Sequence, residues 1–233
     1  MRSHKQSGFS LIELMIAMVL GLVLVGALIN TFISSNRTYR VQEGLAQSQE
    51  SARFALEILG QELRMAGYDL PRGQTYLESK GMADAASITE VLDTCNSEIL
   101  RVVDHGAIAA DRYFYIAPDG QSGINTLYIN GQPSVEGIEG IQFTYGESDG
   151  DDLNSVISYS DSANVSDWGN VIAVRINLLV AGGEPGFMDQ AVNLNRSDDT
   201  TEPFEDFDTS DRRMYQVYST TVALRNAMLD KAE

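Results

Sequence analysis

The chain has 233 residues and a formal net charge of −17, from 33 acidic against 16 basic side chains. This acidity argues against direct nucleic-acid binding through a basic patch, and the length is sufficient for a hydrophobic core. A single cysteine, Cys95, excludes an internal disulfide. We therefore expect a free thiol, with an intermolecular bridge as the alternative.

The N-terminal region contains an apolar run that follows a small residue. The run from Phe9 to Ile29 carries one charge, Glu13, and is long enough to span about 30 Å of hydrocarbon as a helix. An ordinary signal peptide ends its apolar region with a small-residue cleavage site, whereas here Gly8 precedes that region. Cleavage after Gly8 would remove a leader, residues 1–8, and leave the apolar helix on the mature chain.

Basic residues before the apolar run indicate its orientation. Arg2 and Lys5 lie in the short leader, and the long remainder of the chain is acidic. Because basic segments stay in the cytoplasm, we expect a cytoplasmic N-terminus, a single membrane span over 9–29 and a translocated remainder.

The helix is expected to continue beyond the membrane span as an amphipathic segment, residues 30–67. There is no proline between Asn30 and Ala66, Gly67 is a natural stop, and Pro71 lies beyond it. Spacings of three and four indicate one buried stripe, whereas the heptad pattern of a coiled coil is not sustained. The apolar positions are Phe32, Ile33, Tyr39, Val41, Leu45, Ala52, Phe54, Ala55, Ile58, Leu59, Leu63 and Ala66.

Residues 68–233 have a different character, with many Gly, Asp, Ser and Asn residues between short β-branched or alternating runs. Asn130-Gly131 is a hairpin signal. We predict an α+β fold in which one long N-terminal helix packs against a mainly antiparallel β-sheet head. The expected strands are Glu98–Val103, Arg112–Ala117, Thr126–Ile129, Gly140–Tyr145, Val171–Val180 and Tyr215–Leu224.

Two long polar stretches, 146–170 and 193–213, are expected to be loops. Loops of this length without structure are uncommon in compact domains and tend to be functional or mobile.

Catalytic motifs are absent from the sequence. The chain has two histidines, His4 in the leader and His105, which we interpret as a surface or turn residue. No GxSxG, HExxH, P-loop or CxxC motif occurs. We predict that the protein is not an enzyme, and that Trp168 and the aromatic residues 113–115 belong to the core or to an interface.

The segment KQSGFSLIELM, residues 5–15, resembles the class III signal of type IV pilins and secretion pseudopilins. The resemblance implies that a prepilin peptidase cuts after Gly8 and methylates the new N-terminal residue, Phe9. It also implies that Glu13, fifth in the mature chain, pairs with the amine of a neighbouring Phe9 when subunits assemble. The alternatives are an uncleaved anchor and a solvated glutamate that reaches the membrane interface.

Four further segments are similar to PilW-type minor pilins. The resemblance implies a subunit that primes or caps type IV pilus assembly near the pilus tip. Its implied partners are other minor pilins, the major pilin and a pilus-tip adhesin, and its implied location is the inner membrane with a periplasmic head, then the pilus at the cell surface. The alternatives are a minor pseudopilin of a type II secretion system and a membrane-anchored periplasmic binding domain. The segments are 34–68, 135–146 (VEGIEGIQFTYG), 171–180 (VIAVRINLLV) and 211–226 (DRRMYQVYSTTVALRN).

An acidic turn departs from the pattern of these relatives. Many of them carry a run such as DTDGDG after the YG that corresponds to residues 145–146. Here Glu147, Asp149, Asp151 and Asp152 could offer carboxylate oxygens to calcium, but the full spacing and the distal glutamate of an EF-hand are missing. We expect a solvated acidic turn, with a calcium site as the alternative, and no other cofactor. The cysteine pair of many relatives is also missing.

Overall fold

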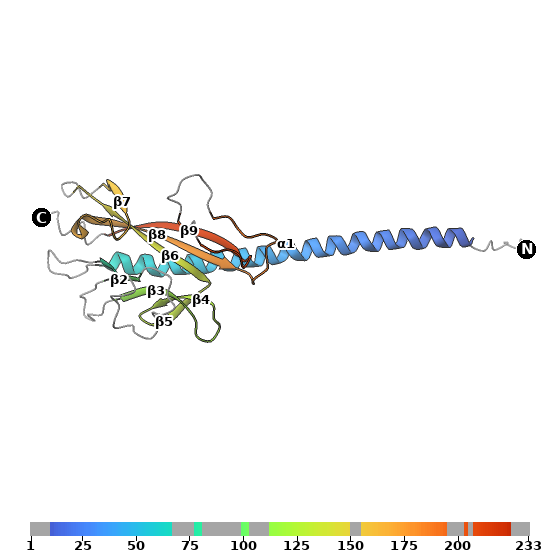
Figure 1. Cartoon of the computed structure of the whole chain (residues 1–233), viewed down its shortest axis with the longest axis horizontal. Coiled ribbons are helices and arrows are strands. Elements are labelled where there is room, and N and C mark those ends of the chain that lie inside the picture. Colours follow the sequence, from blue (N-terminus) through green and yellow to red (C-terminus); the bar gives the residue numbers. More distant parts are fainter. Residues whose placement is uncertain are drawn as a thin grey trace, which may run out of the picture. The chain divides into compact units, whose positions relative to one another are not determined.

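The computed structural model describes residues 10–66, 77–80, 99–102, 112–149, 155–194, 203–204 and 207–224. Gly8, Phe9, Cys95 and His105 lie outside these ranges. Within them the chain forms one α-helix and nine strands (Figure 1). The predicted α+β class is thereby confirmed. The chain divides into two compact units, Met1–Glu43 and Gly44–Glu233.

Helix α1 runs over Leu11–Met65, 55 residues, close to the predicted span over 9–29 and its continuation over 30–67. It begins after Ser10, whose carbonyl oxygen accepts the hydrogen bond from the backbone N–H of Leu14 at 3.1 Å. In the first unit, the large apolar side chains from Leu11 to Ile33 are all more than half exposed. By length and composition, α1 can therefore cross a membrane.

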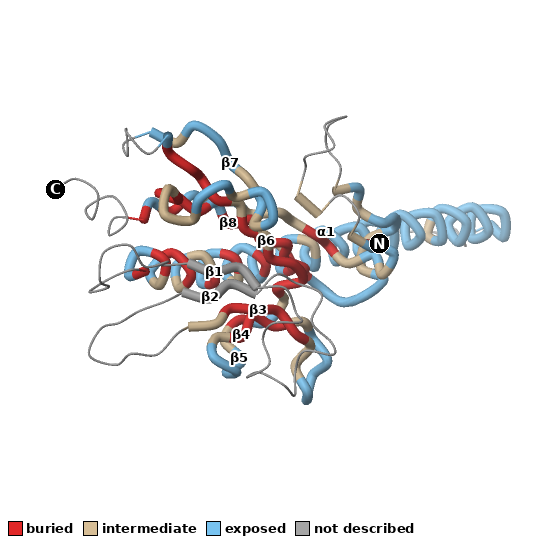
Figure 2. The backbone as a smooth tube through the Cα atoms, turned by 60° about the vertical axis from the view of Figure 1, so that its left-hand side comes forward, coloured by how far each residue is buried: buried red, intermediate tan, exposed pale blue. Residues whose placement is uncertain are grey.

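The part of α1 that belongs to the second unit has one buried stripe (Figure 2). Apart from Gly60, which directly follows Leu59, successive members are four, four and then three residues apart, and this order occurs twice. The mean spacing of about 3.67 residues is close to one helical turn, so the stripe runs nearly straight along the helix. The predicted stripe is wrong at Phe32, Ile33, Tyr39 and Phe54, which are all more than half exposed. It also lacks Gly44 and Ser48, which are buried. The buried residues are Gly44, Ser48, Ala52, Ala55, Leu59, Gly60, Leu63 and Ala66.

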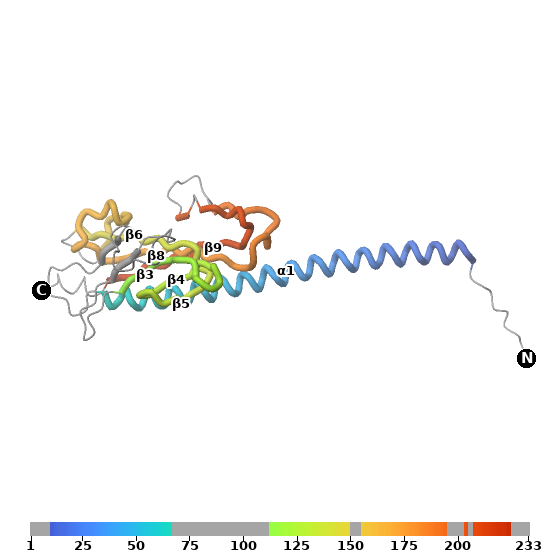
Figure 3. Tube along the Cα trace, turned by 60° about the horizontal axis from the view of Figure 1, so that its bottom comes forward, coloured from blue at the N-terminus to red at the C-terminus, as the bar shows by residue number. Residues whose placement is uncertain are grey.

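The strands form two sheets rather than the single sheet that we expected, and every neighbouring pair is antiparallel. Figure 3 traces β3, β4 and β5 of the first sheet in green and β8 and β9 of the second in orange to red. The first sheet consists, in spatial order, of β1 Leu77–Lys80, β2 Ile99–Val102, β3 Arg112–Pro118, β4 Asn125–Ile129 and β5 Gln132–Glu136. The second consists of β7 Ser158–Ser160, β6 Ile138–Glu147, β8 Val171–Gly182 and β9 Met214–Ala223. A short 3₁₀ helix, η3, covers Trp168–Asn170.

All six predicted strands are present, and their ends differ from the predicted ones by at most two residues. The prediction missed β1, β5 and β7, which are short. The hairpin between β4 and β5 is confirmed. Asn130 and Gly131 have φ angles of 50° and 80°, as a type I′ turn requires.

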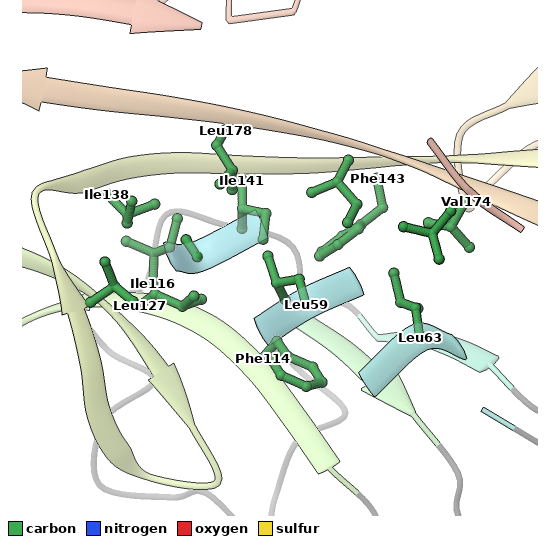
Figure 4. Close-up of a cluster of buried hydrophobic side chains, with 14 of the residues drawn as sticks. Leu59, Leu63, Phe114, Ile116, Leu127, Ile138, Ile141, Phe143, Val174 and Leu178 are labelled. Carbon is green, nitrogen blue, oxygen red and sulfur yellow. The ribbon is translucent and has the colours of Figure 1, made fainter. Parts of the chain in front are cut away.

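The core of the second unit lies between α1 and the inner faces of both sheets (Figure 4). Leu59 and Leu63 of α1 are completely buried, as are Phe114 of β3 and Phe143 of β6. Burying each such side chain contributes roughly 1.5–3 kcal/mol. The helix therefore joins the two sheets through a shared apolar layer, and Phe114 confirms that the aromatic run at 113–115 contributes to the core.

A second, smaller apolar cluster lies on the opposite face of the second sheet. Leu179, Ala181 and Tyr215 are buried there against side chains of the segment between β8 and β9. Gly140 is needed beneath this segment, because a Cβ atom on it would lie 2.7 Å from the ring of Phe204. The described part of the polar stretch 193–213 thus packs on the sheet. The packed side chains are Val192, Leu194, Phe204, Phe207 and Val217.

Candidate functional site

The predicted assembly residue, Glu13, lies in the first turn of α1 and its side chain is exposed. The predicted processing residues, Gly8 and Phe9, precede the described residues. A negative charge in the first turn is favoured by the helix dipole. Ser10 and Glu13 also have the Ser-x-x-Glu spacing of a capping box, a role that our reading of the sequence missed. Glu13 is therefore placed either to stabilise the start of its own helix or to meet a neighbouring chain.

The acidic turn begins with a buried carboxylate. Glu147 is 5% exposed at the end of β6. Its Oε1 atom accepts hydrogen bonds from the backbone N–H groups of Ser166 and Asp167, both at 3.0 Å. A buried carboxylate must be satisfied in this way, because burial without partners is costly. Glu147 therefore anchors a loop, a role that the sequence did not indicate.

The other predicted calcium ligands do not form a cluster with Glu147 in the described residues. Asp149 is exposed, and Asp151 and Asp152 lie outside the described ranges. The described residues contain no group of three Asp, Glu, His or Cys side chains that could hold a metal. Calcium prefers six to eight oxygen ligands, so we derive no calcium chemistry from this turn, and the site stays a prediction.

The stretch 146–170 is more ordered than the loop that we expected. Its described part includes β7, which pairs with β6, and η3, where Asp167 Oδ1 accepts the N–H of Gly169 at 2.8 Å. Trp168 packs edge-on against Tyr145, with 4.7 Å between ring centroids. Trp168 therefore belongs to the core, as predicted, and fixes the loop that Glu147 anchors.

A charged cluster joins strands of the two sheets. Arg213 donates from Nη1 to Glu139 Oε1 and from Nε to Asp211 Oδ2, both at 2.5 Å. Asn125 of β4 donates to the other oxygen of Glu139 at 2.5 Å. The hydroxyl of Tyr215 accepts from Arg213 at 3.1 Å and donates to Asp211 Oδ2 at 2.7 Å. These bonds connect β4, β6 and β9.

The protonation of this cluster follows from burial and pairing. Burial disfavours the charge of Arg213, yet its hydrogen bonds to Glu139 and Asp211 raise the pKa of the guanidinium above its usual range. Burial also opposes the charge of Asp211, but the hydrogen bonds from Arg213 and Tyr215 lower the pKa of this carboxyl. Burial, and then the hydrogen bond to Asp211, raise the pKa of Tyr215.

The cluster borders a cleft of about 350 Å³. The charged groups of the cluster are turned toward one another, and this arrangement connects strands of the two sheets. The lining residues are Gln47, Gly123, Ile124, Asn125, Glu136, Gly137, Glu139, Ala181, Gly183, Glu184, Pro185, Asp211 and Arg213.

Two protein families match the chain. The prokaryotic N-terminal methylation motif matches residues 3–29, the leader and the first part of α1. The chain therefore carries the class III signal of a type IV pilin. The family described as Type IV Pilus-assembly protein W, or PilW, matches residues 116–226, which extend from β3 through β9. This part of the head thus matches the PilW model, and the match supports a pilin role in pilus assembly.

Several solved structures resemble the chain, one of them at 14% sequence identity. That structure is a type IV-like pilin from Thermus thermophilus, with a TM-score of 0.43, and the match covers 77% of this chain and 97% of that one. No curated protein matches the chain.

Proposed function

We propose that the protein is a minor pilin that primes or caps type IV pilus assembly near the pilus tip. The observation that carries the proposal is the methylation motif at 3–29, followed by an exposed apolar helix and, from residue 116, a match to the PilW family. In this proposal residues 1–8 are a leader, and prepilin peptidase cuts after Gly8 and methylates Phe9. The proposal includes no enzymatic activity of the chain.

Before assembly, the proposed location is the inner membrane. The segment 9–29 spans the bilayer, the N-terminus is cytoplasmic, and the head, 68–233, lies in the periplasm, connected through the amphipathic segment 30–67. Subunits then leave the membrane and join a pilus at the cell surface. The proposed partners are other minor pilins, the major pilin and a pilus-tip adhesin.

Glu13 is the proposed docking residue. A charged glutamate at the centre of a bilayer costs about 2.5–3.5 kcal/mol on insertion scales. Glu13 is in the first turn of α1, which supports access to the membrane interface. An incoming Phe9 amine would compensate the remaining desolvation, because an opposite charge stabilises a buried carboxylate. Correct docking of a subunit would thus be coupled to neutralisation of the Glu13 charge by the Phe9 amine of the neighbouring subunit.

Two measurements test this function. Intact mass and N-terminal sequencing, in cells with and without prepilin peptidase, should show a mature chain that starts at methylated Phe9 only when the peptidase is present. Deletion of the gene should then strongly reduce the number of pili seen by electron microscopy, since initiation of pilus assembly needs a primer. An unprocessed Met1 start in both strains would leave the alternative of a membrane-anchored periplasmic binding domain.

The second candidate is a minor pseudopilin of a type II secretion system, because the methylation motif alone is compatible with both classes. Normal pilus numbers together with lost protein secretion in the deletion strain would favour the pseudopilin. The PilW match favours the pilus.

A further inference from the structure

Strand β9 forms one border of the second sheet. It pairs with β8 over ten residue pairs, from Ala173 with Ala223 to Gly182 with Met214, without a register shift. Within the described ranges, no strand pairs with its other side (Figure 1). β9 is therefore a long, regular edge strand.

The register identifies the backbone groups that face away from β8. Leu224 donates its N–H to the carbonyl oxygen of Ile172 at 2.8 Å, so this pair is hydrogen-bonded in the ladder. In an antiparallel ladder such pairs alternate, so the odd-numbered residues of β9 direct their N–H and C=O groups outward. Of these, Ser219, Thr221 and Ala223 are exposed. Donors and acceptors thus repeat every second residue along an accessible edge.

β9 lacks the features that usually protect such an edge. Its sequence, MYQVYSTTVA, has no charged residue, proline or glycine, whereas natural edge strands are usually short or carry charges, prolines or bulges. The other edge strands of the described structure follow that rule. β1 has four residues and β7 has three, and β5 contains Pro133 and Glu136 and is irregularly paired.

A cleft continues this edge at the start of the strand. It has a volume of about 410 Å³ and lies between residues 192–194 on one side and Tyr215–Val217 on the other. Val192, Leu194 and Val217 are among its lining residues, together with the polar Asn193 and Gln216. A strand laid along β9 would reach this cleft, and pockets that accept alternate side chains give strand addition its specificity.

We propose that β9 is a docking edge that receives an extended strand from a different protein chain. The repeat of outward N–H and C=O groups is complementary to another strand. A second copy of this chain is disfavoured, because a formal net charge of −17 makes two copies repel. Because β9 carries no charge that could pair with one on a neighbouring strand, the partner strand that fits it is uncharged. The acidity of this chain favours a partner protein that is less acidic. The inference rests on the proposed function, in which the head contacts other pilus subunits.

Photo-crosslinking in cells tests the proposal. Benzoylphenylalanine at Thr221, in the full chain, should cross-link to an uncharged, extended segment of another protein, identified by mass spectrometry. Ser219→Pro removes one outward N–H without touching the ladder to β8, and should reduce the cross-link roughly tenfold. Ser219→Ala is the matched control: it removes the same side chain, keeps the N–H, and should retain the cross-link.

The outcomes separate this inference from the proposed function. A cross-link only to a second copy of the chain, or equal yields for Ser219→Pro and Ser219→Ala, would overturn the docking edge. So would the absence of a cross-link in protein that is processed at Phe9 and recovered in pili. Absent processing would instead contradict the proposed function. Because Ser219→Pro could unfold the sheet, Ala223→Lys, which adds a charge at an exposed position of the edge, is a second variant that should also reduce the cross-link. Trp168 fluorescence checks folding of both.

Discussion

Gly44 of α1 and Gly182 of β8 lie backbone against backbone. A Cβ atom added to Gly182 would overlap the carbonyl oxygen of Gly44 and would lie 2.9 Å from its carbonyl carbon. A Cβ atom on Gly44 would lie 3.3 Å from the backbone nitrogen of Gly183. Both glycines are therefore needed for space. The small residues at the start of the buried stripe let the helix approach the end of the sheet closely.

Gly182→Ala should therefore destabilise the head. The added methyl group meets backbone atoms, which cannot rotate away, and overpacking of this kind costs about 2–3 kcal/mol. Urea unfolding of the detergent-solubilised full chain, followed by Trp168 fluorescence, measures the change. Gly120→Ala is the control, since nothing lies within 4 Å of its Cβ position. Equal midpoints for the two variants would show that the close approach does not exist.

The cluster around Arg213 should make stability depend on acid. The pKa of Asp211 is lowered in the folded state, so its stabilising contribution is fully present above the unfolded value of about 3.9 and is lost as the pH falls through the lower, folded pKa. Asp211→Asn should therefore be less stable than the parent at pH 7, and the difference should shrink below about pH 4. Urea midpoints measured from pH 7 to pH 2.5 test this. A constant difference would contradict it.

Removal of the Glu147 carboxylate should release the loop that it anchors. Glu147→Ala leaves the N–H groups of Ser166 and Asp167 without their acceptor, and a lost charged hydrogen bond costs about 1.5–3 kcal/mol. Glu147→Gln keeps a carbonyl oxygen there and should lose less. The urea midpoint and the exposure of Trp168 to a fluorescence quencher measure both effects. The exposed Glu184→Ala is the control, and a loss no larger than its loss would contradict the role of Glu147.

Features with local patterns could be predicted from the sequence. Asn130-Gly131 specifies a type I′ turn by itself, and the helix is marked by a long stretch without proline. The burial of Gly44 and Ser48 could not be predicted, because it depends on contacts with distant strands and not on the residues' own apolarity. Gly44 lies against the end of β8, and Ser48 lies beside Tyr218 of β9. β5 was missed because Pro133 weakens a strand pattern. Its pairing is decided by the hairpin turn before it.

The candidate site shows the same division. Glu13 could be singled out because its position follows from a local motif. The anchoring role of Glu147 could not, because its partners Ser166 and Asp167 are 19 and 20 residues away in sequence. A run of acidic residues in the sequence indicates either a metal site or a solvated turn. Only the folded loop brings backbone N–H groups to one of these carboxylates, that of Glu147.

Calcium should leave the stability of the head unchanged. Oε1 of Glu147 already accepts hydrogen bonds from the loop. The carboxylates of the acidic turn therefore offer fewer free oxygen ligands than calcium requires. Unfolding midpoints in about 5 mM calcium, an excess over weak extracellular sites, should equal those in a chelator or in magnesium. A calcium-specific rise that disappears in the double variant Asp151→Asn, Asp152→Asn would establish the metal site instead, because a ligand that binds only the folded state stabilises it.

Substitutions of Glu13 should separate assembly from helix capping. If the Glu13 carboxylate pairs with a neighbouring Phe9 amine, Glu13→Gln should be processed normally but recovered in sheared pili at a level roughly tenfold lower. The reason is that the substitution leaves the desolvated Phe9 amine without its partner charge. Glu13→Asp keeps the charge and should retain much more. Capping predicts the opposite order, because glutamine can replace glutamate in a capping box whereas the shorter aspartate does not belong to that motif. Immunoblots of sheared pili and of membranes give the ratio, and wild-type recovery of Glu13→Gln would leave Glu13 as a helix cap.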